Sequence, residues 1–328
     1  MHTLFKNRLT VLFAILATFL VLSACTRTDD QPDVADEVDT SMDSLVSAAW
    51  LLEHLDDPDL VVIDATVLIE ADASGNLLSI NGRESFEAGH IPGAVFADLL
   101  GDLADMDSEL EFAVPSPEQF AAAMGALGVG GDSRVVLYDR FNTVWATRVW
   151  WMLRWIGFDQ AAILDGGLNA WTAEGGAIST DAVAPTAKTL TVNLRADQIV
   201  GQDEVRAAIG NDSVHLIDAM TEQHYRGEWA MYARPGHITG ASNVPTTALF
   251  DESGKFRSHD ELDALFAGDR GERAITYCGG GIAAAADAYV MHRLGFTDVA
   301  IYAASLQEWA ADPDNPMDVV LEFDDGDD

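Results

Sequence analysis

The side chain best suited to chemistry in this sequence is the thiol of Cys278, at the start of a glycine-rich segment. That segment consists of Cys278, Gly279, Gly280, Gly281, Ile282 and Ala283. It follows an apolar stretch and precedes an alanine-rich one, a pattern that predicts a turn from a strand into a helix. Because a helix N-terminus favours negative charge, it stabilises the thiolate, the reactive form of cysteine. Glycines without Cβ atoms let successive N–H groups point toward one anion, so we predict a thiolate site here.

A purely structural role for Cys278 is the alternative interpretation. Free cysteine is among the residue types most often buried, and the three glycines would also suit an ordinary turn from a strand into a helix. The only other cysteine, Cys25, lies near the start of the sequence. If Cys25 is used in another way, Cys278 has no cysteine to pair with and keeps a free thiol, so the residues around Cys25 bear on the role of Cys278.

Residues 1–24 have the features of a secretory signal. A basic start with Lys6 and Arg8 precedes an apolar run, 9–22, which is shorter than the ~20 residues that span a membrane. The sequence Leu-Ser-Ala-Cys, ending at Cys25, resembles a bacterial lipoprotein signal. We therefore expect an exported protein, held on the periplasmic face of the cell envelope, at the outer membrane, only by a lipid on Cys25. An unpaired thiol is unusual in an exported protein, which favours a chemical role for Cys278.

The formal net charge of −36 excludes nucleic acid as a plausible partner. Residues 25–44 are rich in acidic side chains and poor in apolar ones, which predicts a solvated tether. A second acidic segment, 321–328, is predicted to form the tail. Residues 45–55 predict an amphipathic helix at the start of the folded region. The chain between the two acidic segments is long enough for two domains.

An internal repeat supports two domains. The sequence Gly-His-Ile-Pro-Gly-Ala at 89–94 recurs as Gly-His-Ile-Thr-Gly-Ala at 236–241. Each copy lies among apolar segments that predict strands, and these are 60–65, 134–138 and 161–164 in the first half and 216–219, 273–277 and 299–302 in the second. In each half a helix follows the middle strand and ends at Gly-Phe, as expected for a glycine just past a helix C-terminus. We predict an α/β fold of two tandem domains, 45–180 and 192–320, each a parallel sheet with helices on both faces, joined by a linker at 181–191.

The order of these elements, the paired Gly-His-Ile turns and the cysteine loop together resemble the two-domain rhodanese family of thiosulfate and 3-mercaptopyruvate sulfurtransferases. The motifs at 135–139, 149–151 and 164–171 resemble the first domain of that family, and 302–309 resembles the closing strand of its second domain. The resemblance implies that Cys278 begins a six-residue catalytic loop. The matching position in the first half is Asp139, so the first domain would be a non-catalytic partner.

The resemblance implies a transfer of sulfane sulfur from thiosulfate or 3-mercaptopyruvate to cyanide or a thiol, through a persulfide on Cys278. The partners would be a small-molecule sulfur donor and a thiophilic acceptor. The loop amides would stabilise the anion, and we expect neither an organic cofactor nor a metal. The sequence leaves the oligomeric state open, and a monomer is the expectation.

The donor is less well defined than the reaction. Thiosulfate enzymes of the family commonly have a basic residue just after the cysteine and mercaptopyruvate enzymes have Cys-Gly-Ser-Gly, whereas this loop is neutral. Arginines typical of the family are replaced by Met220 and His224. We expect substrate-binding cations, if present, among Arg226, Arg234 and Arg140, although each also suits a surface salt bridge.

Two other functions are weighed against the sulfurtransferase. A cysteine phosphatase of this general fold needs an arginine six positions after the cysteine, and position 284 is Ala284. The other candidate is a non-enzymatic exported carrier of sulfur or polysulfide, which would accept one sulfur on Cys278 without turning over. The nucleophile and its glycine loop favour the enzyme.

Overall fold

The computed structural model describes residues 42–73 and 77–320. The predicted signal at 1–24, the predicted lipidation site at Cys25 and the predicted tail at 321–328 lie outside the described residues, as does the predicted tether at 25–44 except for its last three residues. No helix of the described segments is long and apolar enough to cross a membrane.

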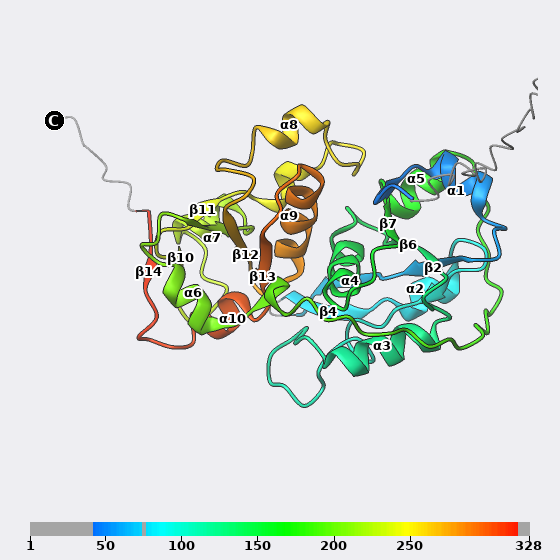
Figure 1. The fold of residues 1–328 in the computed structure, drawn as a ribbon, viewed down its shortest axis with the longest axis horizontal. Helices are drawn as coiled ribbons and strands as arrows, with labels where there is room; N and C mark the ends of the chain where they lie inside the picture. Colours follow the sequence, from blue (N-terminus) through cyan, green and yellow to red (C-terminus); the bar gives the residue numbers. More distant parts are fainter. Residues whose placement is uncertain (1–41, 74–76, 321–328) are drawn as a thin grey trace, which may run out of the picture. The chain divides into compact units, whose positions relative to one another are not determined.

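The described residues form two five-stranded sheets in which all strands are parallel (Figure 1). The first has the order β1-β7-β6-β2-β5, with bounds Leu45–Val46, Ala161–Leu164, Arg134–Tyr138, Leu60–Asp64 and Val95–Phe96. The second has the order β8-β13-β12-β9-β11, with bounds Ile199–Val200, Val299–Tyr302, Arg273–Tyr277, Val214–Asp218 and Ser242–Asn243. Because the two orders match strand by strand, the repeat in the sequence is a repeat of the fold, and the predicted fold class is confirmed.

Helices cover both faces of each sheet. Those of the first half are α1 Ala48–His54, α2 Arg83–Ala88, α3 Pro117–Ala126, α4 Val144–Trp155 and α5 Gly167–Ala173. Those of the second half are α6 Gln202–Ala208, α7 Glu222–Arg226, α8 His259–Asp263, α9 Ile282–Arg293 and α10 Ser305–Trp309, with 3-10 turns η1 Ala196–Gln198 and η2 Thr246–Leu249. On strand β6, Val135 and Leu137 pack in one apolar core with α3 and α4, whereas Val136 and Tyr138 pack in another with α1, α2 and α5. This alternation follows from the two-residue period of a strand that is buried on both faces.

Helices α4 and α9, which follow the central strands of the two sheets, pack against each other. Their apolar residues belong to one continuous core that includes residues of both halves. The ring of Trp150 meets that of Tyr289 edge to face, with centroids 4.8 Å apart. The loop that enters α9 is therefore built next to residues of the first half.

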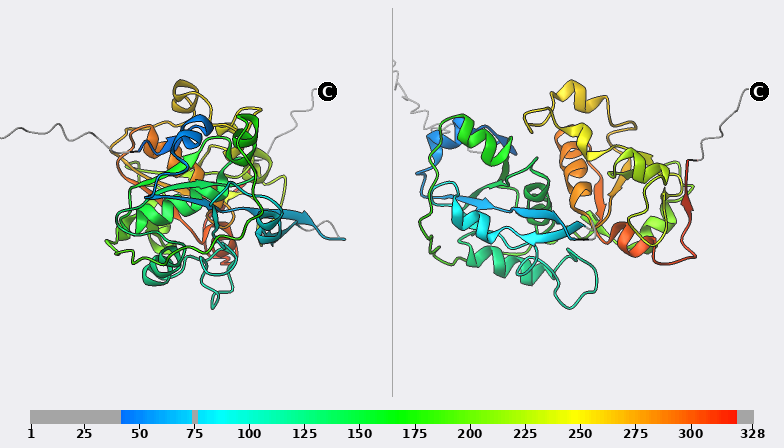
Figure 2. Two further views of the ribbon diagram at one scale, coloured as in Figure 1. Left: turned by 90° about the vertical axis from the view of Figure 1, so that its right-hand side faces the viewer. Right: turned by 180° about the vertical axis from the view of Figure 1, so that it is seen from behind.

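Two small antiparallel sheets complete the fold. Strands β3 Val67–Ala71 and β4 Leu77–Asn81 form a hairpin that projects from the first half in the left view of Figure 2. Strands β10 His237–Ile238 and β14 Met317–Asp318 pair near the end of the described chain.

The start of the folded region differs from the prediction of one helix over 45–55. Leu45 and Val46 instead form strand β1, which pairs with β7, and helix α1 begins only at Ala48. The reason is Ser47, whose side chain accepts the N–H of Trp50 and so caps the helix after the strand. The predicted helix ends at Gly-Phe are confirmed, since Gly157 and Gly295 both adopt positive φ just after α4 and α9.

Candidate active site

Cys278 directly follows strand β12, and the loop that it begins leads into helix α9. Gly281 caps that helix with φ of +80°, and a Cβ atom there would lie 2.7 Å from the carbonyl oxygen of Ala303, so both its conformation and its surroundings favour glycine. The N–H of Gly281 donates to Sγ of Cys278 at 3.1 Å. Although only 3% of Cys278 is exposed, its sulfur therefore faces a loop amide as the thiolate hypothesis requires.

Residues at the start of helix α10 form hydrogen bonds with the backbone of Cys278. The hydroxyl of Ser305 accepts the N–H of Cys278 at 3.1 Å and donates to the carbonyl of Tyr302 at 2.7 Å. The N–H of Leu306 donates to the Cys278 carbonyl at 3.0 Å. Ser305 has φ of +54°, a conformation that is strained for a residue with a Cβ atom, and strain of this kind is often held at functional sites.

Two side chains lie over the glycines of the loop. A Cβ atom on Gly279 would overlap the hydroxyl of Tyr232, and one on Gly280 would overlap Nε2 of Gln307. Burial raises the pKa of Tyr232, and the negative charges of Cys278, Glu111 and Asp218 raise it further. The phenol is therefore a neutral hydrogen-bond donor at physiological pH.

Gln307 also joins the loop to the first half. Its side-chain oxygen accepts the N–H of Glu111 at 3.0 Å, and its amide donates to the Glu111 carbonyl at 3.2 Å. This pair of hydrogen bonds lies beside the cysteine loop, so the first half forms part of the surroundings of Cys278.

The loop at the matching position of the first half holds a carboxylate. Backbone N–H groups of four residues donate to the two oxygens of Asp139 at 2.8–3.1 Å, and these are Phe141, Thr143, Trp145 and Ala146. Burial raises the pKa of Asp139 to about 6 although these donors oppose the rise. Above that pH the loop binds an anion through its backbone amides, as a nest does. The corresponding loop of the first half therefore binds an anion through backbone amides, as the sequence predicts for 278–283, but it is one residue longer before its helix.

Arg148 reaches the cysteine loop from helix α4 of the first half. Its guanidinium donates to the carbonyl of Gly281 at 3.4 Å and to that of Phe112 at 2.9 Å. Only 1% of the residue is exposed. Burial lowers the pKa of Arg148 to about 10, and the negative charge of Cys278 opposes that lowering. Arg148 is not recognisable from the sequence alone, because it lies among the tryptophans of a helix, 130 positions from the cysteine.

The arginines expected from the sequence have other partners. Arg234 donates to the backbone carbonyls of Trp309, Ala310, Asp312 and Asn315. Arg226 pairs with Glu228 at 2.8 Å, and Arg140 donates to the carbonyls of Ser85 and Gly89 within the first half. None of these contacts is with the cysteine loop.

The positions where the family has arginine are built differently here. The N–H of Met220 donates to the carboxylate of Asp218 at 2.7 Å. His224 is buried, its Nδ1 lies 2.7 Å from the hydroxyl of Thr221, and burial lowers its pKa. Neither residue supplies a permanent cation.

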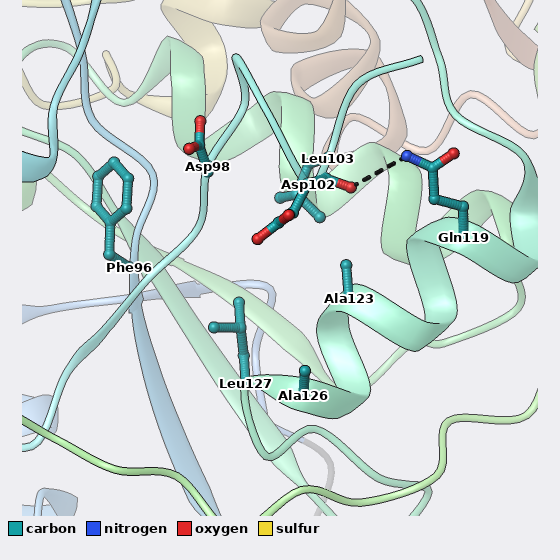
Figure 3. A pocket seen from close by; sticks show the side chains of 8 residues that line it. All are labelled: Phe96, Asp98, Asp102, Leu103, Gln119, Ala123, Ala126 and Leu127. Carbon is teal, nitrogen blue, oxygen red and sulfur yellow. Dashed lines mark hydrogen bonds between the residues drawn. The ribbon is translucent and has the colours of Figure 1, made fainter. Parts of the chain in front are cut away.

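Other parts of the described chain offer less chemistry. A pocket in the first half lies between helix α3 and the 98–103 segment (Figure 3), and it is lined by Phe96, Asp98, Asp102, Leu103, Gln119, Ala123, Ala126 and Leu127. These residues include no cysteine and no cation. No group of three or more His, Cys, Asp or Glu side chains in the described residues is arranged to hold a metal ion.

Comparison with known proteins agrees with this architecture. The model of the Rhodanese-like domain matches residues 47–174 and 201–312. The 3-mercaptopyruvate sulfurtransferase of Escherichia coli is 36% identical over 286 residues, which are 84% of this chain and 98% of that protein. The human 3-mercaptopyruvate sulfurtransferase is 31% identical, over 85% of this chain and 95% of that protein. The crystal structure of SseA from Escherichia coli, a 3-mercaptopyruvate sulfotransferase with the rhodanese fold, has a TM-score of 0.71 and 34% identity, covering 80% of this chain and 98% of that one.

The chain belongs to the rhodanese family. Within it, the two matched domains and the full-length relatives define a two-domain sulfurtransferase, so the class of enzyme expected from the sequence is confirmed. The predicted domain boundaries and the roles of individual site residues remain predictions.

Proposed function

We propose that Cys278 is the sulfur carrier of this enzyme and that 3-mercaptopyruvate or thiosulfate is its donor. The observation that carries the proposal is the hydrogen bond from the N–H of Gly281 to Sγ of Cys278. The corresponding loop of the first half, which is one residue longer, binds the Asp139 carboxylate by four backbone amides. A loop of this form stabilises negative charge on sulfur without a neighbouring general base.

In the first step, the thiolate of Cys278 attacks the donor sulfur. With thiosulfate, the bond between the two sulfur atoms breaks and sulfite leaves with the electron pair. With 3-mercaptopyruvate, the carbon–sulfur bond breaks, and the pyruvate enolate that leaves takes up a proton at carbon. Either donor leaves a persulfide on Cys278.

In the second step, a nucleophile attacks the outer sulfur of the persulfide. Cyanide becomes thiocyanate, and a thiolate becomes a persulfide. The electron pair of the sulfur–sulfur bond returns to Cys278, so the enzyme is regenerated and ping-pong kinetics are expected.

Of the two donors we favour 3-mercaptopyruvate. The two relatives reported above carry its name, and the loop residues after Cys278 are uncharged glycines. Thiosulfate is a dianion whose sulfonate oxygens a basic residue beside the cysteine would bind, and position 279 is Gly279.

The test is a comparison of donors in steady state. Purified protein is incubated with each donor and cyanide, and thiocyanate is measured beside a Cys278→Ser control. We expect many turnovers with 3-mercaptopyruvate, fewer with thiosulfate, and none in the control. At most one equivalent of thiocyanate per protein would instead identify a sulfur carrier.

We also propose that the enzyme is anchored at the cell envelope, on the periplasmic face of the outer membrane. The support for this is the Leu-Ser-Ala-Cys sequence behind the apolar run at 9–22. Mass spectrometry of membrane-extracted protein tests it. The expected N-terminus is an acylated Cys25, and any other mature N-terminus would refute the anchor.

A further inference from the structure

Arg148 is buried in an unusual way for an arginine. Its guanidinium hydrogen bonds are to two backbone carbonyls, those of Gly281 and Phe112, and Nε has no partner within the described structure. Both of these residues adopt positive φ, +80° for Gly281 and +57° for Phe112. A left-handed conformation is strained for phenylalanine, and here the carbonyl of that residue accepts a hydrogen bond from the guanidinium.

The described residues provide no carboxylate partner for Arg148. Other arginines of the chain form ion pairs, among them Arg134 with Asp57 and Asp59, and Arg273 with Glu204 and Asp298. Burying a cation without an anion is strongly unfavourable, and proteins rarely keep such a group without compensation. The anion that can compensate Arg148 is the thiolate of Cys278, because Arg148 donates to the carbonyl of Gly281 and the N–H of the same residue donates to Sγ.

We propose that Arg148 is a positioning residue that balances the charge on Cys278 from across the interface between the two halves. By donating to the Gly281 carbonyl, the guanidinium holds the backbone of Gly281 in place. The N–H of the same residue then points at Sγ of Cys278. The positive charge of Arg148 then stabilises the thiolate and, after sulfur transfer, the persulfide anion. This inference rests on the proposed role of Cys278.

The first half then has a function in the site of the second half. Its own loop carries Asp139 in place of a nucleophile, so it performs no sulfur chemistry of its own. It contributes instead a cation to the site of the second half, together with the backbone of Glu111 and Phe112.

The charged and titratable groups around the cysteine loop define the controls. Arg148 approaches from α4, and Tyr232 lies over Gly279 with Glu111 and Asp218 near its hydroxyl. Of these groups, Arg148 is the one that is positively charged at neutral pH. Removing it should therefore make the thiolate less stable, whereas the other groups stay unchanged.

The experiment measures alkylation of Cys278 by iodoacetamide as a function of pH, read at that residue by peptide mass spectrometry, in the resting protein without donor. Arg148→Met removes the charge and keeps much of the length of the side chain, and Arg148→Lys keeps the charge. Arg154→Met is the matched control, because Arg154 lies on the same helix and pairs with Asp159.

For Arg148→Met we expect alkylation about tenfold slower near neutral pH, with the midpoint of the pH profile about one unit higher. Arg148→Lys and Arg154→Met should give profiles close to that of the wild type. Identical profiles for Arg148→Met and the wild type would overturn the inference. Since no donor is present, this readout stands apart from a failure of the sulfur transfer itself.

A second measurement covers the case in which Arg148→Met does not fold. The free energy of unfolding is compared for the wild type and Cys278→Ser from about pH 5 to about pH 9. If the thiolate neutralises Arg148, the wild type gains stability relative to Cys278→Ser as the pH rises. A difference that stays constant or shrinks over this range would contradict the inference.

Discussion

Asp139 and Cys278 occupy the same place in the two halves of the molecule. Each follows the last residue of a central strand, and the backbone carbonyl of each accepts an N–H at 3.0 Å, from Leu168 for Asp139 and from Leu306 for Cys278. Corresponding loops thus hold a carboxylate in one half and a thiol in the other, although the loop of Asp139 has one residue more before its helix, since Thr143 caps α4 and Gly281 caps α9. The anion-binding property belongs to the backbone, and the residue at the first position decides what chemistry is done with it.

The first prediction concerns Asp218, a buried carboxyl at the end of strand β9. Burial raises its pKa from 3.8 to about 6, so the folded state binds a proton more tightly than the unfolded state does. The contribution of the group to stability is therefore complete below about pH 4 and is lost as the pH rises through about 6. Relative to Asp218→Asn, the wild type should lose about 3 kcal/mol of unfolding free energy over this range.

Chemical denaturation of both proteins at several pH values measures this loss. Asp64→Asn is the variant matched to Asp218→Asn. Asp64 ends strand β2, the equivalent of β9 in the first half, and burial also raises the pKa of Asp64. A stability difference between wild type and Asp218→Asn that is constant, or that grows with pH, would show that the carboxyl is not buried as described.

The second prediction concerns Ser305, the strained residue behind the cysteine. Ser305→Ala leaves the buried N–H of Cys278 without an acceptor, which costs about 1–3 kcal/mol, and it loosens the loop. We expect lower kcat/KM as well as lower stability. Ser305→Gly loses the same hydroxyl but relieves the positive φ, so it should be the more stable of the two variants. Thermal unfolding of Ser305→Ala and Ser305→Gly tests this order of stability. A more stable alanine variant would contradict the backbone strain at position 305.

The third prediction couples Gly279 to Tyr232. Gly279→Ala forces the tyrosine hydroxyl out of its place, because the added methyl would overlap it. We expect a loss of stability of about 1–3 kcal/mol and reduced activity. In a Tyr232→Ala background the clash is absent, so Gly279→Ala should then cost much less.

A double-mutant cycle on the unfolding free energy measures this coupling. Additive effects of the two substitutions would mean that the tyrosine does not lie over the loop.

Much of the fold could be predicted because its signals are local. The central strands at 134–138, 161–164, 273–277 and 299–302 are apolar runs bounded by polar or turn residues, and the structure has them at those bounds. The short strands at the edges, such as β1, are two residues long and have no period of their own. They exist because a neighbouring strand offers hydrogen bonds, which no local pattern reveals.

The cysteine loop was also visible in the sequence, since Gly281 has a positive φ that glycine adopts freely and side chains lie too close to Gly279 and Gly280 for a Cβ atom. Arg148 was not, because its role depends on a contact between two helices far apart in the sequence. Arg234 shows the opposite case. It was a candidate for substrate binding, but its donors are taken up by the backbone carbonyls of 309–315.

The most direct test of the account is the mass of the protein after a brief incubation with 3-mercaptopyruvate and no acceptor. We predict one added sulfur atom, located on the peptide that contains Cys278 and removed by cyanide. Sulfur transfer that continues in Cys278→Ser, or added sulfur found only elsewhere in the chain, would contradict the central claim that this loop holds the sulfur.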